Sequence, residues 1–168
     1  SHQAIGFMIE IASLQPHQVT DAKYIISAVA QRIYYPEKTP EYFYDILAEE
    51  GELQDVDNFQ QEYVNNQGIF LVVLDDGKLV GTGALKKMDD TTAELKRLWL
   101  LESYHGHKIG YQVVMRLLEF AREKGYTRVR LQTGTVQARA VEFYKKLGFY
   151  EIESYRESMD NLSMELIL

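Results

Sequence analysis

The stretch 93–149 constrains the fold of this chain more than any other part of the sequence. Residues 93–100 (AELKRLWL) have the branched and aromatic side chains of a strand, and a polar turn with two glycines follows at 103–110 (SYHGHKIG). Apolar side chains then recur every three or four residues over 113–121, which predicts a helix that begins near the end of the turn. Gly125 is placed to close that helix.

A strand that leads through a glycine-containing turn into a helix is a general arrangement for binding an anion. The first N–H groups of a helix have no partner within the helix, and the helix dipole adds partial positive charge there. We therefore expect a phosphate-bearing compound to bind over His105–Tyr111. The turn lacks the Gly-Lys-Ser/Thr ending of the nucleotide phosphate loop, and Gly106 and Gly110 have no third glycine at dinucleotide-motif spacing.

The rest of the chain predicts antiparallel strands before this stretch and two closing strands after it. The sequence Asp76-Gly77 between two β-branched runs predicts a tight hairpin. A helix between the strands 93–100 and 128–133 implies that these two strands are parallel. The fold class is thus α/β (α+β), with a mixed central sheet whose antiparallel N-terminal strands lead into a parallel βαβ unit. Further strands are expected at 7–14, 69–74, 79–85, 150–155 and 162–168, and further helices from Pro16 to Ile33, at 41–50 and at 55–64.

Three sequence blocks, in this order and spacing, resemble the GNAT superfamily of acetyl-coenzyme A-dependent N-acetyltransferases. They are AELKRLWL (93–100), YHGHKIGY (104–111) and QARAVEFYKKLGF (137–149). The resemblance extends to the strands of 69–88 and implies the GNAT-like acyl-CoA N-acyltransferase fold. It also implies a single domain over 1–168, with an acceptor-side region at about 1–68 and an acetyl-CoA-binding core at about 69–155.

The resemblance implies two catalytic residues. Glu94 stands at the offset of a glutamate that acts as a base in several members, usually through water, and Tyr144 stands where a tyrosine points at the coenzyme sulfur. Strict alternation along the strand places Glu94 on one face with Leu98 and Leu100 and turns Arg97 to the opposite face. The alternatives are a strand carboxylate paired with a neighbouring cation, and a half-buried aromatic side chain with a satisfied hydroxyl.

The same resemblance implies the residues that bind the coenzyme. Lys108 stands where the family usually has glycine, and a residue with a Cβ atom adopts a positive φ only at a cost. His105 replaces the usual Arg or Gln, and Gln137 replaces Asn beside the pantetheine arm. The predicted set is Leu98, Trp99 and Leu100, whose strand backbone pairs with the pantetheine amides, then His105, Gly106, His107, Lys108, Ile109, Gly110, Tyr111, Gln137, Phe143 and Lys146.

Composition limits the alternatives. The 168 residues include no cysteine, which excludes disulfides and a thiolate nucleophile and predicts no metal site. The net charge of −7 argues against nucleic-acid binding, and no apolar run is long enough to predict a membrane span, so a cytoplasmic protein is expected. Up to Val80 there are 13 acidic and 4 basic residues, whereas from Gly81 there are 12 and 14, an asymmetry that suits a cationic amine acceptor or an ordinary acidic surface.

The sequence thus predicts an enzyme that moves an acetyl group from acetyl-CoA directly to a primary amine of a small molecule or protein, through a ternary complex and without a covalent acyl-enzyme. A homodimer formed through the closing strands is a further expectation. Two other classes stay open. One is a catalytically degenerate GNAT fold that senses acyl-CoA or binds a partner, and the other is a phosphate-binding protein outside the family.

Overall fold

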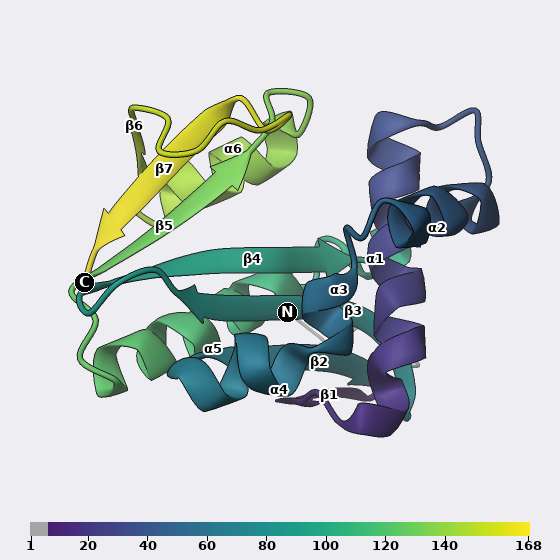
Figure 1. The fold of residues 1–168 in the computed structure, drawn as a ribbon, viewed down its shortest axis with the longest axis horizontal. Coiled ribbons are helices and arrows are strands. Elements are labelled where there is room, and N and C mark those ends of the chain that lie inside the picture. Colours follow the sequence, from purple (N-terminus) through teal and green to yellow (C-terminus); the bar gives the residue numbers. More distant parts are fainter. Residues whose placement is uncertain (1–6) are drawn as a thin grey trace.

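Seven strands form one sheet in this computed structural model, which describes residues 7–168 (Figure 1). Residues 1–6 of the predicted domain lie outside the described part. The order across the sheet is β1-β2-β3-β4-β5-β7-β6. The strands are β1 (Ile9–Ser13), β2 (Ile69–Asp75), β3 (Lys78–Lys87), β4 (Thr92–Leu100), β5 (Arg128–Thr133), β6 (Tyr150–Ile152) and β7 (Leu162–Ile167).

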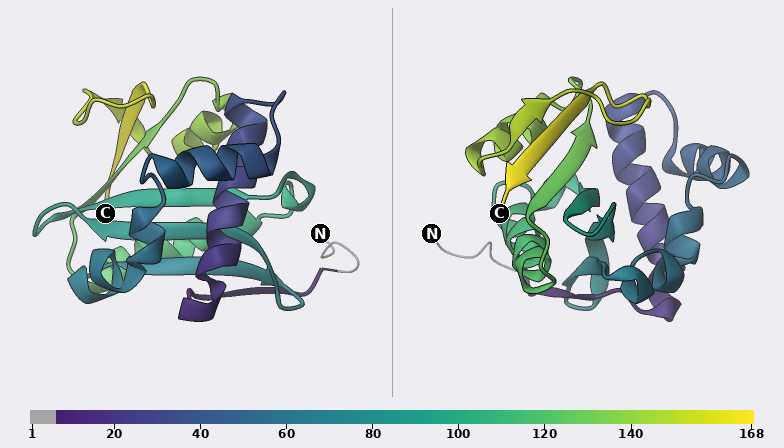
Figure 2. Two further views of the ribbon diagram at one scale, coloured as in Figure 1. Left: turned by 45° about the vertical axis from the view of Figure 1, so that its right-hand side comes forward. Right: turned by 60° about the vertical axis from the view of Figure 1, so that its left-hand side comes forward.

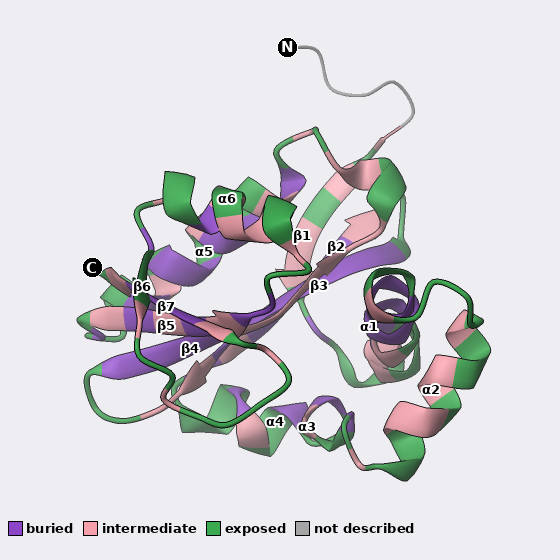
Figure 3. Ribbon diagram, turned by 90° about the horizontal axis from the view of Figure 1, so that it is seen from above, coloured by how far each residue is buried: buried purple, intermediate pink, exposed green. Residues whose placement is uncertain are grey.

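The helices cover both faces of the sheet. Viewed from above, α5 and α6 lie on one side and α1 to α4 on the other (Figure 3). Each face has its own apolar core, one around Leu71, Leu117 and Leu131 and one around Ile26, Val56 and Phe70. The helices are α1 (Val19–Tyr34), α2 (Pro40–Glu49), α3 (Gln54–Asp57), α4 (Phe59–Glu62), α5 (Ile109–Glu123) and α6 (Ala138–Lys146), with 3₁₀ turns η1 (Pro16–Gln18), η2 (Val64–Asn66) and η3 (Glu102–Tyr104).

Local signals predicted most of these elements. The helix expected from the apolar spacing begins at Ile109, and Gly125 follows its end with φ +90°. Asp76 and Gly77 both have positive φ in the tight β2–β3 turn. The mixed sheet and the βαβ unit are confirmed, since β4 and β5 are parallel and the neighbouring strands pair antiparallel.

The prediction of one helix over 55–64 is wrong. Asn58, at φ −104° and ψ 32°, leaves the helical conformation and separates α3 from α4. The apolar spacing nevertheless identifies the buried side chains, because Val56, Phe59 and Tyr63 all lie in the core under α1. Burial against the sheet therefore fixes these side chains although the backbone between them is not continuous helix.

The two parallel strands of the sheet separate soon after they meet. β4 pairs with β5 only at Thr92, Ala93 and Glu94. Beyond this point β5 continues beside β7, and the two halves of the sheet diverge, as Figure 1 shows for β4 and β5. The two turned views show β5, β7 and α6 standing away from β1 to β4 (Figure 2). The edge of β4 that faces β5 therefore has no strand partner from Leu95 to Leu100 among the described residues.

A β-bulge in β4 changes which side chains face which core. The register to β3 shifts between Ala84↔Lys96 and Thr82↔Trp99, and Arg97 sits in the left-handed region at φ 58°. One extra residue reverses the alternation of every side chain after it. The prediction that Glu94 shares a face with Leu98 and Leu100 is therefore wrong: both leucines pack on the α5 side.

Candidate functional site

The start of α5 presents main-chain N–H groups that have no protein partner. Within the described residues, the amides of 106–111 donate no hydrogen bond, and the first helical bond runs from Gln112 N to Lys108 O at 3.0 Å. Cβ atoms built at Gly106 and Gly110 meet no atom within 4 Å, so the backbone there is uncovered. The arrangement fits an anion such as a pyrophosphate.

His105 differs from its neighbours. Its main-chain N–H donates to Glu102 O at 3.0 Å, so the prediction of a free amide at this residue is wrong. Its ring Nε2 lies 3.0 Å from Leu100 O, and Nε2 must carry the hydrogen because a carbonyl oxygen only accepts. His105 thus ties the turn to the end of β4. The next side chain, His107, packs edge-on against the ring of Phe7.

Lys108, which stands where the resemblance implies glycine, adopts a left-handed conformation with φ 62° and ψ 17° at the N-cap of α5. A left-handed residue with a Cβ atom costs about 1–2 kcal/mol, whereas the greater freedom of glycine in the unfolded chain costs about 0.5–1 kcal/mol. We therefore expect Lys108→Gly to stabilise the protein by up to about 1 kcal/mol, which raises Tm by about 2–4 °C in thermal unfolding followed by circular dichroism.

The matched control for this change lies at the other end of the same helix. Lys124 has φ −82° in the right-handed region, so glycine relieves nothing there and Lys124→Gly is expected to lower Tm. Equal losses in the two variants would show that Lys108 carries no conformational strain.

The free edge of β4 leads into this turn. Trp99 and Leu100 pair on their other side with Thr82 and Gly81 of β3. Leu98 and Leu100 pack toward α5, and Trp99 packs toward α1. The Leu100 carbonyl oxygen is bonded to the His105 ring. The other peptide groups of Leu98–Leu100 that face β5 are available to an extended amide-bearing chain, in the way that an added strand pairs with an open sheet edge.

Tyr144 lies on the inner side of α6. Its ring packs against Phe143 and Phe149, with centroids 5.5 and 5.7 Å apart, and the residue is 6% exposed. No hydrogen-bond partner for its hydroxyl occurs in residues 7–168. Burial, and then the charge of Asp160, raise the pKa of this hydroxyl. Tyr144 is therefore protonated at neutral pH and can act as a proton donor.

Glu94 is a buried carboxylate that is paired with the exposed Arg156. Arg156 Nη1 and Nη2 donate to its two oxygens at 2.8 and 3.0 Å, and the Tyr155 hydroxyl donates at 2.8 Å. Lys96 Nζ lies 3.9 Å away, and Glu94 is 3% exposed. Burial alone would raise the pKa of this carboxyl, but the bonds from Arg156 and the charge of Lys96 outweigh burial and lower it. Glu94 is an ionised carboxylate with little tendency to take up a proton.

Arg97 does not neutralise Glu94, but not for the reason that alternation suggests. The bulge turns Arg97 to the α3 side, where Nη2 and Nε donate to Asp55 at 2.6 and 3.1 Å. The Tyr63 hydroxyl donates to the same carboxylate at 2.6 Å, and Arg97 O accepts from the Thr82 hydroxyl at 2.6 Å. These contacts hold the bulge, and through it the free edge of β4, in place.

Gln137 at the N-cap of α6 takes part in a polar cluster. Its Nε2 donates to the Tyr34 hydroxyl at 2.8 Å, and that hydroxyl donates to Asp160 Oδ1 at 3.1 Å. Sequence reasoning singled out Gln137 but missed Tyr34, Asp160 and the partner Arg156. No motif marks them, because they come from α1 and the β6–β7 loop, outside the three sequence blocks.

The remaining predicted residues lie along α5 and α6. Ile109 is buried in the core, and Tyr111 is exposed beside the uncovered turn. Phe143 is half-buried beside Tyr144. Lys146 is exposed in the last turn of α6, where a cation also complements the helix dipole.

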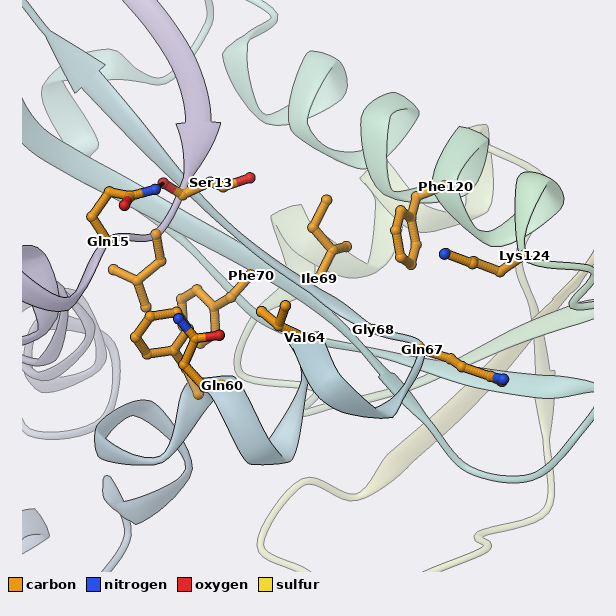
Figure 4. Close-up of a pocket in the computed structure, with 12 residues that line it drawn as sticks. Ser13, Gln15, Gln60, Val64, Gln67, Gly68, Ile69, Phe70, Phe120 and Lys124 are labelled. Carbon is orange, nitrogen blue, oxygen red and sulfur yellow. Dashed lines mark hydrogen bonds between the residues drawn. The ribbon is translucent and has the colours of Figure 1, made fainter.

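A surface pocket lies away from this turn. It has a volume of about 380 Å³ and opens between β2, α4 and the C-terminal end of α5, the end opposite Lys108 (Figure 4). Phe120 and Lys124 line one side, and Gln60 and Val64 line the other. Its lining includes no carboxylate or histidine, and Lys124 is the ionisable side chain there. The uncovered turn and the free β4 edge, rather than this pocket, form the candidate site.

Residues 7–168 contain neither a metal-binding cluster nor a membrane-spanning helix. No group of His, Cys, Asp or Glu side chains in this part of the chain is arranged to hold a metal ion. No helix there combines the length and apolar character needed to cross a membrane.

Solved structures share this fold over almost the whole chain. The paia N-acetyltransferase of Thermoplasma acidophilum, in complex with coenzyme A, superposes with a TM-score of 0.80 at 24% identity and covers 96% of this chain and 99% of its own. An acetyltransferase from Streptococcus agalactiae superposes with a TM-score of 0.77 at 25% identity, over 98% and 99% of the two chains.

Proteins with similar sequences are also named as N-acetyltransferases. Human N-acetyltransferase 8 is 35% identical over 101 residues, which is 56% of this chain and 44% of that protein. The chain thus spans less than half the length of this curated relative. Residues 30–149 match the acetyltransferase (GNAT) family, and this match includes β2 to β5, the α5 turn and α6. The chain therefore belongs to the acetyltransferase (GNAT) family.

Proposed function

We propose that this protein transfers an acetyl group from acetyl-CoA to a primary amine by direct attack in a ternary complex. The observation that carries the proposal is the place where β4 and β5 separate, here called the opening between β4 and β5. It consists of the unpaired β4 edge from Leu95 to Leu100 and the uncapped amides at the start of α5. The first feature can bind a pantetheine arm and the second a pyrophosphate. Family membership and relatives named N-acetyltransferases support the amine as the acceptor.

The residues would act as follows. The amides of Gly106–Tyr111 bind the pyrophosphate, and the backbone of Leu98–Leu100 pairs with the pantetheine amides. A main-chain N–H at Leu100 or its neighbour stabilises the oxyanion as the nitrogen attacks the thioester carbon. The C–S bond breaks, and the leaving sulfur takes a proton from Tyr144.

A base must also take a proton from the acceptor nitrogen. The sequence assigns this role to Glu94, and this stays a prediction. Because both carboxylate oxygens of Glu94 accept bonds from Arg156, its contacts favour a role in holding Arg156 and Lys96 beside the opening. This observation also favours the alternative function, an acyl-CoA sensor of the same fold without turnover.

The acceptor is proposed to be cationic, because the acidic part of the chain up to Val80 supplies α1 to α4 beside the opening. The cytoplasmic location and the homodimer expected from the sequence stay predictions.

Coenzyme A binding and thiol release test the proposal together. At one hundred times its Kd, coenzyme A would stabilise the protein by about 2.7 kcal/mol, and Tm would rise by about 5–10 °C. Acetyl-CoA with a panel of primary amines is expected to release free thiol well above the background hydrolysis rate. Stabilisation without thiol release would favour the sensor, and a response to nucleotides but not to coenzyme A would contradict both functions.

A further inference from the structure

A second carboxylate lies beside the opening between β4 and β5. Asp160, in the β6–β7 loop, accepts a hydrogen bond from the Tyr34 hydroxyl at 3.1 Å through Oδ1. Its main-chain N–H donates to the Ser158 hydroxyl at 3.0 Å. No partner for Oδ2 is found within residues 7–168, so one carboxylate oxygen is free to bind a substrate.

The position of this carboxylate follows from its neighbours. Gly134 is the first residue after β5, and a Cβ atom built on it would lie 3.8 Å from Asp160 Oδ1 and 3.6 Å from the Tyr34 hydroxyl. Asp160 therefore lies at the carboxyl end of β5, where β5 has already separated from β4. Ligands of open sheets with parallel strands bind in the crevice outside these strand ends.

The loop that carries Asp160 is fixed at both ends. Arg156 binds Glu94 of β4, and its main-chain oxygen accepts from Gln132 Nε2 at 2.8 Å. Asn161 Oδ1 accepts from Thr135 N at 2.9 Å. The ion pair between buried Glu94 and exposed Arg156 thus positions the segment that brings Asp160 to the opening.

The two carboxylates differ as proton acceptors. Both oxygens of Glu94 are bound to a guanidinium, whereas Asp160 accepts a single side-chain hydrogen bond from a neutral hydroxyl. Burial raises the pKa of Asp160, although the Tyr34 bond and the charge of Lys96 act in the opposite direction. Burial and the Asp160 charge also raise the pKa of Tyr34 to about 12, so Tyr34 stays a donor and holds the carboxylate in place.

We propose that Asp160, rather than Glu94, binds the ammonium group of the acceptor and takes its proton. This inference rests on the proposed acetyl transfer. The ammonium gives one proton to Asp160 Oδ2, and the freed electron pair on nitrogen forms the C–N bond as the C–S bond breaks. The sulfur takes a proton from Tyr144, and the second proton lost from nitrogen as the amide forms restores that hydroxyl.

The groups around Asp160 set its pH dependence. Tyr34 faces it from α1, Lys96 from β4 and Tyr144 from α6, and Gln137 bonds to Tyr34 from the start of α6. Tyr34→Phe removes the donor that favours the charged carboxylate. It should therefore move the acid limb of the kcat/KM profile to higher pH, an effect that a purely structural role of Tyr34 would not produce.

The decisive experiment compares Asp160→Asn with Glu157→Gln, an exposed carboxylate in the same loop. The probes are benzylamine and spermidine, which are mostly protonated at neutral pH, and hydroxylamine, which is mostly neutral. Thiol release from acetyl-CoA is followed for each probe, together with Tm and coenzyme A binding by calorimetry. Loss of a general base lowers a rate by about 10²–10⁴-fold.

We expect Asp160→Asn to lose at least about a hundredfold in kcat/KM with the alkylamines. Its rate with hydroxylamine, its Tm and its affinity for coenzyme A should stay near those of the wild type, as should all rates of Glu157→Gln. Equal rates for Asp160→Asn and the wild type, or equal losses with alkylamines and hydroxylamine, would overturn the assignment. A larger loss in Glu94→Gln, at unchanged Tm, would return the role to Glu94. A wild type that releases no thiol with any probe would overturn the proposed acetyl transfer itself, and the assignment with it.

Discussion

Tyr144→Phe is expected to lower kcat for acetyl transfer by about a hundredfold, near the lower end of the range for general acid catalysis. A thiol with a reference pKa of about 8.5 is a moderate leaving group, so protonating it helps less than protonating an alkoxide would. The KM for acetyl-CoA should change little, because the phenyl ring keeps its packing against Phe143 and Phe149. Steady-state kinetics by thiol detection measure both constants.

Stability provides an internal check on this variant. The Tyr144 hydroxyl has no partner in the described part of the chain, so its removal leaves no polar group unpaired and Tm should not fall. Tyr126→Phe is the matched control, because the Tyr126 hydroxyl bonds to Gln67 O at 2.8 Å, away from the opening, and its loss should leave kcat unchanged. Unchanged kcat in Tyr144→Phe would show that the leaving sulfur needs no proton from this residue.

Asp55→Asn is expected to cost the largest amount of folding stability. The Asp55 and Arg97 side chains are 17% and 19% exposed, and removing one partner of a buried pair costs about 3–5 kcal/mol because the other charge stays buried. The expected fall in Tm is about 6–20 °C. Since Arg97 is the bulged residue of β4, weaker coenzyme A binding should accompany this loss. Differential scanning calorimetry and isothermal titration calorimetry measure the two effects.

The stability lost in Asp55→Asn is expected to depend on pH. Burial would raise the pKa of the Asp55 carboxyl, but the hydrogen bonds and charge of Arg97 outweigh burial and lower it. A carboxyl with a lowered pKa in the folded state stabilises above its unfolded pKa, near 4, and this contribution is lost as pH falls through the folded pKa. The difference in unfolding free energy between wild type and Asp55→Asn should therefore shrink on acidification. Asp57→Asn, in the same helix as Asp55, breaks a pair with Lys23 of α1 in which the Asp57 side chain is 47% exposed. Because water solvates this carboxylate, the loss should be at most about 1 kcal/mol.

Short-range patterns were enough to predict the turn at the start of α5, the part of the site that is proposed to bind coenzyme A. The start of α5, its end at Gly125 and the Asp76–Gly77 turn each depend on residues within a few positions of one another. Apolar spacing and turn chemistry record such local requirements in the sequence. The strand, turn and helix around the uncovered amides could therefore be predicted before the structure was known.

The acid–base part of the site depends on contacts between distant segments. Arg97 meets Asp55 across 42 positions, Glu94 meets Arg156 across 62, and Tyr34 meets Asp160 across 126. The first contact holds the bulge that reverses the side-chain alternation of β4. The second binds both carboxylate oxygens of Glu94, the predicted base, and the third holds the Asp160 carboxylate at the opening. Periodicity within one element carries no information about such pairs, because residues so far apart in the sequence come into contact only when the elements pack together. The sequence by itself thus determined the family, the parallel βαβ unit and the glycine-containing turn at the start of α5. The tertiary structure decided which carboxylate oxygen has no protein partner, because that depends on contacts between distant segments.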